Sequence, residues 1–203
     1  MNDTKRGQSP TTPHLNPSIT LPRSVEESVA MERSGHPLRF LFFWGNRRET
    51  DGSVGRGCLS QWWESAFSAD GYTFRSSEHY MMAHKAWLFE DHETAENILE
   101  ARHPGEAKKL GRAVKGFDEY TWEKHRYEIV LRGSIAKFSA DAEMREFLLR
   151  TRNRVLVEAS PLDRIWGIGL ARTDERASSP ASWQGLNLLG FALMEAREAL
   201  AGE

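Results

Sequence analysis

The chain has 203 residues, of which 39% are hydrophobic and 28% charged, and its 27 basic and 29 acidic side chains leave a net charge of −2. This length fits one domain, and the composition is ordinary for a globular protein. Proteins that bind polyanions without specificity usually have a clear basic excess, so the balanced charge argues against nucleic acid as a bulk partner.

The first 36 residues have the composition of a tail. The stretch GQSPTTPHLNPSITLPRS is rich in proline, serine, threonine and asparagine, and its apolar residues follow no period. We predict that residues 1–36 are disordered and that a single domain extends from 37 to 203. This domain begins with a predicted strand, PLRFLFFWG at 37–45.

Short strands and many helices follow. A glycine-rich polar loop at 46–58 lacks the glycine spacing of a phosphate-binding loop. Asp70-Gly71 predicts a hairpin turn, and RVLVEAS at 154–160 predicts a strand. The predicted helices span 76–89, 91–102, 103–112, 118–138 (which Gly133 can interrupt), 139–151 and 186–200. This order predicts a predominantly helical α+β domain with a few short strands.

The helix at 76–89 carries two charges on a largely apolar face. That face consists of Glu78, Met81, Met82, Lys85, Leu88 and Phe89. A carboxylate that faces inward is costly unless it is paired or hydrogen-bonded. The residues alone allow two interpretations: a structural ion pair with other segments, or a pocket in which burial raises the carboxyl pKa for acid catalysis. Two helical turns separate the charges by about 10.5 Å, so a ligand or a third residue would connect them.

A second candidate element is EASPLDRIWGIGL, at 158–170. A strand ends here and continues into a loop with Asp163, Trp166, Gly167 and Gly169. Active-site residues often lie on loops that follow scaffold strands. The alternative interpretation is a turn aspartate next to a core tryptophan.

A third element, AKKLGRAVKGF, is locally basic through Lys108, Lys109, Arg112 and Lys115. Such a cluster is either a solvated helix face or a phosphate site, because arginine offers a planar fork of donors and lysine a mobile charge.

Other residues argue against metal chemistry. The only cysteine, Cys58, excludes a cysteine-based zinc site and an internal disulfide. His79 and His84 are five residues apart, not the four that place two ligands on one helical face. We therefore expect no metal and no cofactor. No apolar run approaches the roughly 18 residues of a membrane span, and the N-terminus lacks the apolar core of a signal peptide, so we expect a cytoplasmic protein.

The three candidate elements, in this order, resemble the YbiA-like family, also called NADAR for a proposed link to NAD and ADP-ribose. The resemblance covers about residues 40–203. The matching stretches are FFWG (42–45), LSQWW (59–63), SSEHYMMAHKAWLF (76–89), AKKLGRAVKGFDEYTW (107–122), AKF (136–138), LVEASPLDRIWGIGL (156–170) and WQGLNLLGFALMEAR (183–197).

The resemblance implies an N-glycosidase and a set of site residues. Members similar to this chain cleave the bond between ribose 5-phosphate and the aminopyrimidine base of early riboflavin-biosynthesis intermediates. The catalytic positions fall on Glu78, Lys85 and Asp163. Substrate binding is expected at Arg112, Lys108, Trp122, Trp166, Gly167, Asn187, Trp44 and Trp62.

Two alternative functions stay open at this point. One is an ADP-ribosyl glycohydrolase that acts on modified guanine in nucleic acid, and the other is a non-catalytic module that binds a nucleotide or ADP-ribose. The expected partner under the leading interpretation is a small phosphoribosyl aminopyrimidine, with no membrane partner.

Overall fold

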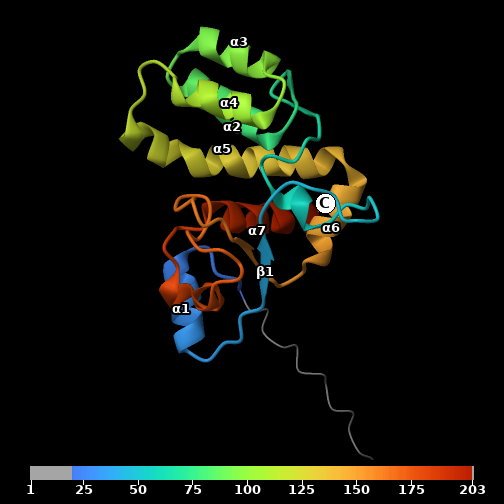
Figure 1. The fold of residues 1–203 in the computed structure, drawn as a ribbon, viewed down its shortest axis with the longest axis vertical. Coiled ribbons are helices and arrows are strands. Elements are labelled where there is room, and N and C mark those ends of the chain that lie inside the picture. The colour runs from blue at the N-terminus through green and yellow to red at the C-terminus, as the bar shows by residue number, and fades with distance from the viewer. Residues whose placement is uncertain (1–19, 203) are drawn as a thin grey trace, which may run out of the picture.

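The computed structural model describes residues 20–202, and this part of the chain is mostly helical, with four short strands (Figure 1). The helices are α1 (Val25–Arg33), α2 (Ser77–Leu88), α3 (His92–Glu100), α4 (Pro104–Arg112), α5 (Glu119–Ala140), α6 (Ala142–Arg150) and α7 (Leu188–Ala201). Short 3-10 helices are η1 (Arg56–Leu59), η2 (Glu175–Ser178) and η3 (Pro180–Ser182). The strands are β1 (Phe40–Phe43), β2 (Phe67–Ala69), β3 (Tyr72–Phe74) and β4 (Val155–Glu158). The predicted α+β class is confirmed.

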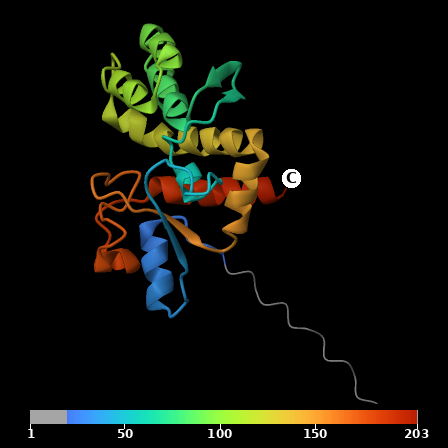
Figure 2. The ribbon, with the colours of Figure 1, turned by 45° about the vertical axis from the view of Figure 1, so that its right-hand side comes forward.

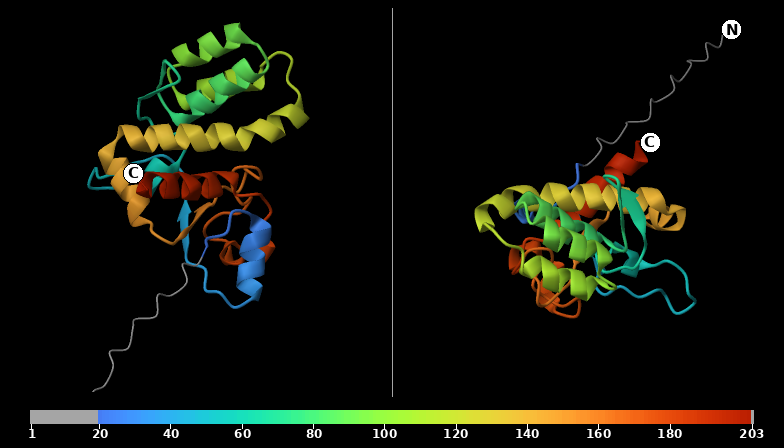
Figure 3. Two further views of the ribbon diagram at one scale, coloured as in Figure 1. Left: turned by 180° about the vertical axis from the view of Figure 1, so that it is seen from behind. Right: turned by 90° about the horizontal axis from the view of Figure 1, so that it is seen from above.

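Helix α5 crosses the middle of the molecule and separates two groups of elements. Helices α2, α3 and α4 lie on one side of α5, and α7 with β1 lies on the other (Figures 1 and 3). The helix continues through Gly133 without the interruption that the sequence allowed. A Cβ atom at Gly133 would lie 2.5 Å from the Tyr80 ring, so the missing side chain lets α2 pack closely against α5.

Capping side chains fix where the helices begin. Asp91 and Asp118 are the predicted N-caps of α3 and α5, and each accepts a backbone N–H three residues ahead. Ser76 caps α2 in the same way and accepts from the His79 N–H. The start of α2 is therefore set by local chemistry, which fixes where Glu78 lies relative to the core.

The strands form two separate pairs. β1 and β4 are parallel, with Phe40 opposite Val155 and Phe43 opposite Glu158, so their carboxyl ends meet at one edge. β2 and β3 form the predicted hairpin, visible beside α5 in Figure 2. Its turn has positive φ at Asp70 and Gly71, which matches the right-handed twist of the strands.

The predicted disordered tail is wrong for its second half. Residues 1–19 lie outside the described residues, but α1 forms within the predicted tail and is capped by Ser24. Arg23 forms ion pairs with Glu195 and Glu198 of α7, and Val25 packs against the core. The segment before α1 is rich in proline and serine, and it determined the average composition of residues 1–36. The helix-forming stretch VEESVAMER was too short to change that average.

No helix among residues 20–202 is both long enough and apolar enough to cross a membrane.

Candidate active site

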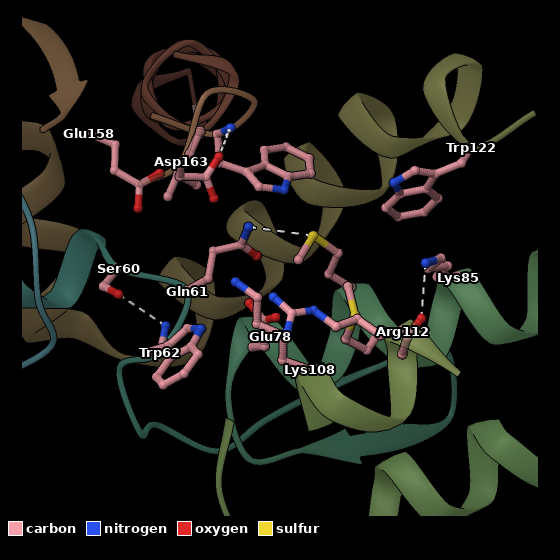
Figure 4. A pocket seen from close by; sticks show the side chains of 15 residues that line it. Ser60, Gln61, Trp62, Glu78, Lys85, Lys108, Arg112, Trp122, Glu158 and Asp163 are labelled. Atoms are coloured by element: carbon pink, nitrogen blue, oxygen red, sulfur yellow. Dashed lines mark hydrogen bonds between the residues drawn. The ribbon is translucent and has the colours of Figure 1, made fainter. Parts of the chain in front are cut away.

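A pocket opens where α2 and α4 face the carboxyl end of β4 and the start of α7 (Figure 4). It encloses about 160 Å³. Its lining residues come from seven segments that are distant in sequence: Ser60, Gln61, Trp62, Glu78, Met81, Met82, Lys85, Lys108, Gly111, Arg112, Trp122, Glu158, Asp163, Trp166 and Leu189. The three elements that the sequence singled out therefore meet in one place.

Helix α2 contributes the floor of the pocket. Glu78, Met81, Met82 and Lys85 all line it, as expected for one helical face. The first three are almost fully buried. Glu78 lies in the centre of the pocket beside Lys108 and Arg112 in Figure 4, with no direct contact to Lys85.

The buried Glu78 and the partly buried Glu158 each place a buried carboxyl oxygen in the pocket without a hydrogen-bond partner among the described residues. These oxygens are Oε1 of Glu78 and Oε2 of Glu158. Burial raises the pKa of Glu78 to about 7, opposed by the charges of Lys108 and Arg112. Burial also raises the pKa of Glu158 to about 8, and the negative charges of Asp163 and Glu78 raise it further. Both groups therefore take up protons near neutral pH, which suits acid–base chemistry.

Asp163 lies beside Trp166 and also organises its own loop. Its Oδ1 accepts the backbone N–H of Ile165 at 2.9 Å and that of Trp166 at 2.7 Å. Asp163 is therefore a turn aspartate, as one interpretation of the sequence had it, and its carboxylate also lines the pocket next to an indole (Figure 4).

The basic residues of α4 and of the loop after it are divided between the pocket and the solvent. Lys108 and Arg112 line the pocket, and Nζ of Lys108 lies 5.8 Å from the centroid of the Trp62 ring. Lys109 is exposed, and Lys115 forms an exposed ion pair with Glu93 at 2.9 Å. The pocket thus contains a pair of cations from one helical face, one turn apart.

Lys85 stands at the far end of the pocket from Glu158 (Figure 4). Its Nζ donates to the carbonyl oxygen of Gly111 at 2.9 Å. The same ammonium lies 4.0 Å from the Phe117 ring centroid and 5.6 Å from that of Trp122. Lys85 therefore joins α2 to the end of α4 and contacts the aromatic wall of the pocket.

Gly167 and Asn187 lie behind the pocket and are not among its lining residues. A Cβ atom at Gly167 would lie 2.8 Å from the carbonyl oxygen of Glu158, so the glycine allows the loop to pack on β4. The Asn187 side chain accepts the N–H of Glu158 at 3.0 Å and donates to the carbonyl of Leu156 at 2.9 Å. Both residues hold the end of β4 in place, in contrast to the expected direct binding of substrate.

Trp44 also lies outside this pocket. It is 63% exposed and lines a separate hollow, whereas Trp62, Trp122 and Trp166 line the pocket itself. Of the four tryptophans that we expected around one ligand, three line this pocket.

Sequence reasoning missed five lining residues: Ser60, Gln61, Gly111, Glu158 and Leu189. The loop with Ser60 and Gln61 is held by Lys137 of α5, whose buried Nζ donates to the carbonyls of Cys58 at 2.6 Å and Ser60 at 2.9 Å. One feature of the sequence could have indicated that Glu158 is a site residue. Glu158 is the polar residue that ends a buried strand, and ligand sites favour the carboxyl ends of parallel strands.

Comparison with known proteins places the chain in a family. The sequence model of the NADAR domain matches residues 42–201, which is most of the chain. The chain belongs to the NADAR family. The match includes every residue that lines the pocket.

Relatives within the NADAR family have named activities. An N-glycosidase of Acanthamoeba polyphaga mimivirus is 39% identical over 165 residues, which cover 79% of this chain and 95% of the relative. N-glycosidase YbiA of Escherichia coli is 35% identical over 134 residues, covering 66% of this chain and 75% of YbiA. The NMR structure of the E. coli protein YbiA matches with a TM-score of 0.64 and 30% identity, over 80% of this chain and 85% of that chain.

A third relative is a maize protein called riboflavin biosynthesis protein PYRR, chloroplastic. It is 35% identical over 143 residues, which cover 66% of this chain but only 21% of the maize protein. The chain is thus a member of a family of YbiA-like N-glycosidases, and its fold is the YbiA-like fold.

Proposed function

We propose that this protein hydrolyses the C–N bond between ribose 5-phosphate and the amine of an aminopyrimidine, as found in early riboflavin-biosynthesis intermediates. One observation carries the proposal: a buried and a partly buried carboxyl, with pKa values raised to about 7 and about 8, share a pocket with three cations and three tryptophans. The activity named for YbiA and the pathway named for the maize relative support the bond type and the substrate class.

The charges of the pocket suggest how the substrate is oriented. Lys108 and Arg112 suit the 5′-phosphate, because a phosphate is bound well by a guanidinium fork and a mobile ammonium. Glu78 adjoins these cations and would therefore lie next to the ribose. For Glu158 the strongest influence from a neighbouring charge is that of Asp163, which lies beside the Trp166 indole, and this side of the pocket suits a flat base.

The proposed reaction assigns one carboxyl to each side of the bond. Protonated Glu158 donates its proton to the departing amine nitrogen, which keeps the electron pair of the C1′–N bond. Ionised Glu78 stabilises the developing oxocarbenium ion and removes a proton from the water that adds to C1′. Ribose 5-phosphate and the free base are the products, and the proton on Glu78 returns to Glu158 through solvent.

The remaining lining residues hold these groups in place. Asp163 carries negative charge near the reacting carbon and keeps Trp166 oriented through its hydrogen bonds. Lys85 lies beside Trp122 and donates a hydrogen bond to the last turn of α4. Through this contact it positions Arg112, which ends that helix. Lys85 in this proposal is a positioning residue, and no metal ion takes part.

The test is release of ribose 5-phosphate from the ribosylamine phosphate of a diaminopyrimidine by the purified full chain. We expect turnover by the parent protein, at least a hundredfold slower turnover by Glu158→Gln and Glu78→Gln, and parental turnover by the exposed control Glu96→Gln. Turnover should also fall above about pH 8, because Glu158 then loses the proton that it donates.

Folded protein without turnover would contradict the substrate. If it instead released ADP-ribose from ADP-ribosylated guanine, the bond type would stand and the substrate would be wrong. Unchanged turnover by both glutamine variants would contradict the assigned residues.

A further inference from the structure

The hollow beside Trp44 is a second concave site on the protein. It encloses about 480 Å³ and shares no lining residue with the pocket around Glu78. The lining includes Trp44, Arg47, Arg48, Glu49, Arg56 and Arg172. We call this site the arginine hollow.

Positive charge is concentrated in the arginine hollow although the chain as a whole has a net charge of −2. Four arginines line it against one glutamate, and none of the four forms an ion pair with a carboxylate in the described part of the chain. Like charges repel when they are gathered without counter-charges, so an arrangement of this kind suits an anionic ligand.

Two of the four arginines already donate side-chain hydrogen bonds within the protein, and two do not. Arg48 donates to the Gly52 carbonyl at 3.0 Å, and Arg56 donates to the Phe42 carbonyl at 3.4 Å. Arg47 and Arg172 make no side-chain hydrogen bond within residues 20–202. Their guanidinium forks are therefore available for phosphate oxygens.

An exposed indole lies in the same hollow. Trp44 follows the last residue of β1 and leaves 63% of its surface open to solvent. Its neighbour Asn46 fixes the loop, because its Nδ2 donates to the Trp62 carbonyl at 2.8 Å. An indole on an anchored loop beside free arginines is a platform on which a nucleobase can stack.

We propose that the arginine hollow binds a nucleoside triphosphate, with its base on Trp44 and its phosphates on Arg47 and Arg172. The volume of the hollow lies in the range of about 300–1,000 Å³ that is usual for small-molecule sites. The ligand is flat at one end and carries several negative charges at the other, as the lining requires. This proposal does not depend on the proposed reaction, because the two sites have no residue in common.

A single nucleotide fits better than a nucleic-acid strand. Arginines continue past Arg56 into a neighbouring hollow, but their donors are already used there. Arg150 pairs with Glu146, and Arg154 donates to the carbonyls of Thr151 and Arg150. Free donors are therefore interrupted next to the arginine hollow, where a strand would need them to continue. The next free guanidinium groups within residues 20–202, those of Arg39 and Arg152, line a further hollow beyond Arg150.

Calorimetric titration of the full chain with ATP tests the site, with inorganic tripolyphosphate as a second probe. We expect the double variant Arg47→Gln/Arg172→Gln to bind ATP at least about tenfold more weakly, because two charge-assisted contacts are lost. Trp44→Ala should weaken ATP but leave tripolyphosphate unchanged. Arg33→Gln, an exposed arginine at the end of α1, is the matched control and should bind ATP like the parent.

Four results would overturn the proposal. The first is no binding of ATP by the folded parent at millimolar concentration, and the second is equal binding by the parent and the double variant. The third is a short oligothymidylate that binds more tightly than ATP and is weakened by the double variant, which would identify a nucleic-acid strand as the occupant. Displacement of ATP by ribose 5-phosphate would place the nucleotide in the other pocket and would also contradict the proposal.

Discussion

Burial of Glu78 has a measurable effect on stability. Burial raises the pKa of this carboxyl from 4.5 to about 7. Between these two values the unfolded chain has lost the proton and the folded chain still holds it, so the unfolded state binds fewer protons and the free energy of unfolding falls as the pH rises. The loss amounts to about 3 kcal/mol, since one pKa unit corresponds to about 1.36 kcal/mol.

Glu78→Gln removes this titration and keeps the shape of the side chain. We therefore expect the variant to gain stability relative to the parent as the pH rises from 5 to 8, by about 2.5 kcal/mol, because part of the loss already occurs below pH 5. Any constant effect of the amide cancels, because only the change with pH is compared. Urea unfolding followed by circular dichroism at several pH values within the range measures this difference.

The control is Glu96→Gln on the exposed face of α3, where we expect no change relative to the parent across the same pH range. A stability difference between Glu78→Gln and the parent that stays constant from pH 5 to pH 8 would refute the reasoning. It would mean that the carboxyl of Glu78 ionises in the folded protein as it does in the unfolded chain.

Three other substitutions test separate parts of the structure. Arg112→Gln should raise KM for the phosphorylated substrate about tenfold and change kcat little, because one charge-assisted contact to phosphate is lost; steady-state kinetics would disprove this if kcat alone fell. Gly133→Ala should lower the free energy of unfolding by about 1–3 kcal/mol, because the new Cβ meets the Tyr80 ring at 2.5 Å; an unchanged Tm would show that α2 and α5 separate easily. Asn187→Gly allows the left-handed backbone at φ 52° but removes the hydrogen bond to the Glu158 N–H. Urea unfolding should therefore show a free energy of unfolding lower by about 1–3 kcal/mol, and equal stability would contradict the role of Asn187 in anchoring β4.

Local patterns were sufficient to predict most elements. The face of α2, the caps at Asp91 and Asp118 and the hairpin turn at Asp70 depend on residues only a few positions apart, and each is found as predicted. The sequence alone also placed Glu78 on an inward face. These features depend on backbone geometry and hydrophobic period, which a short stretch of sequence contains.

Contacts between distant segments had to come from the tertiary structure. Glu158 becomes a pocket residue only because β4 pairs in parallel with β1 and its end faces α2, and no period in the sequence encodes that pairing. Tertiary packing likewise brings the Asn187 side chain into hydrogen-bonding contact with β4 and places Trp44 in a separate hollow. The protonation of Glu78 and Glu158 has the same origin, because it follows from removal of water by side chains that are far away in the sequence.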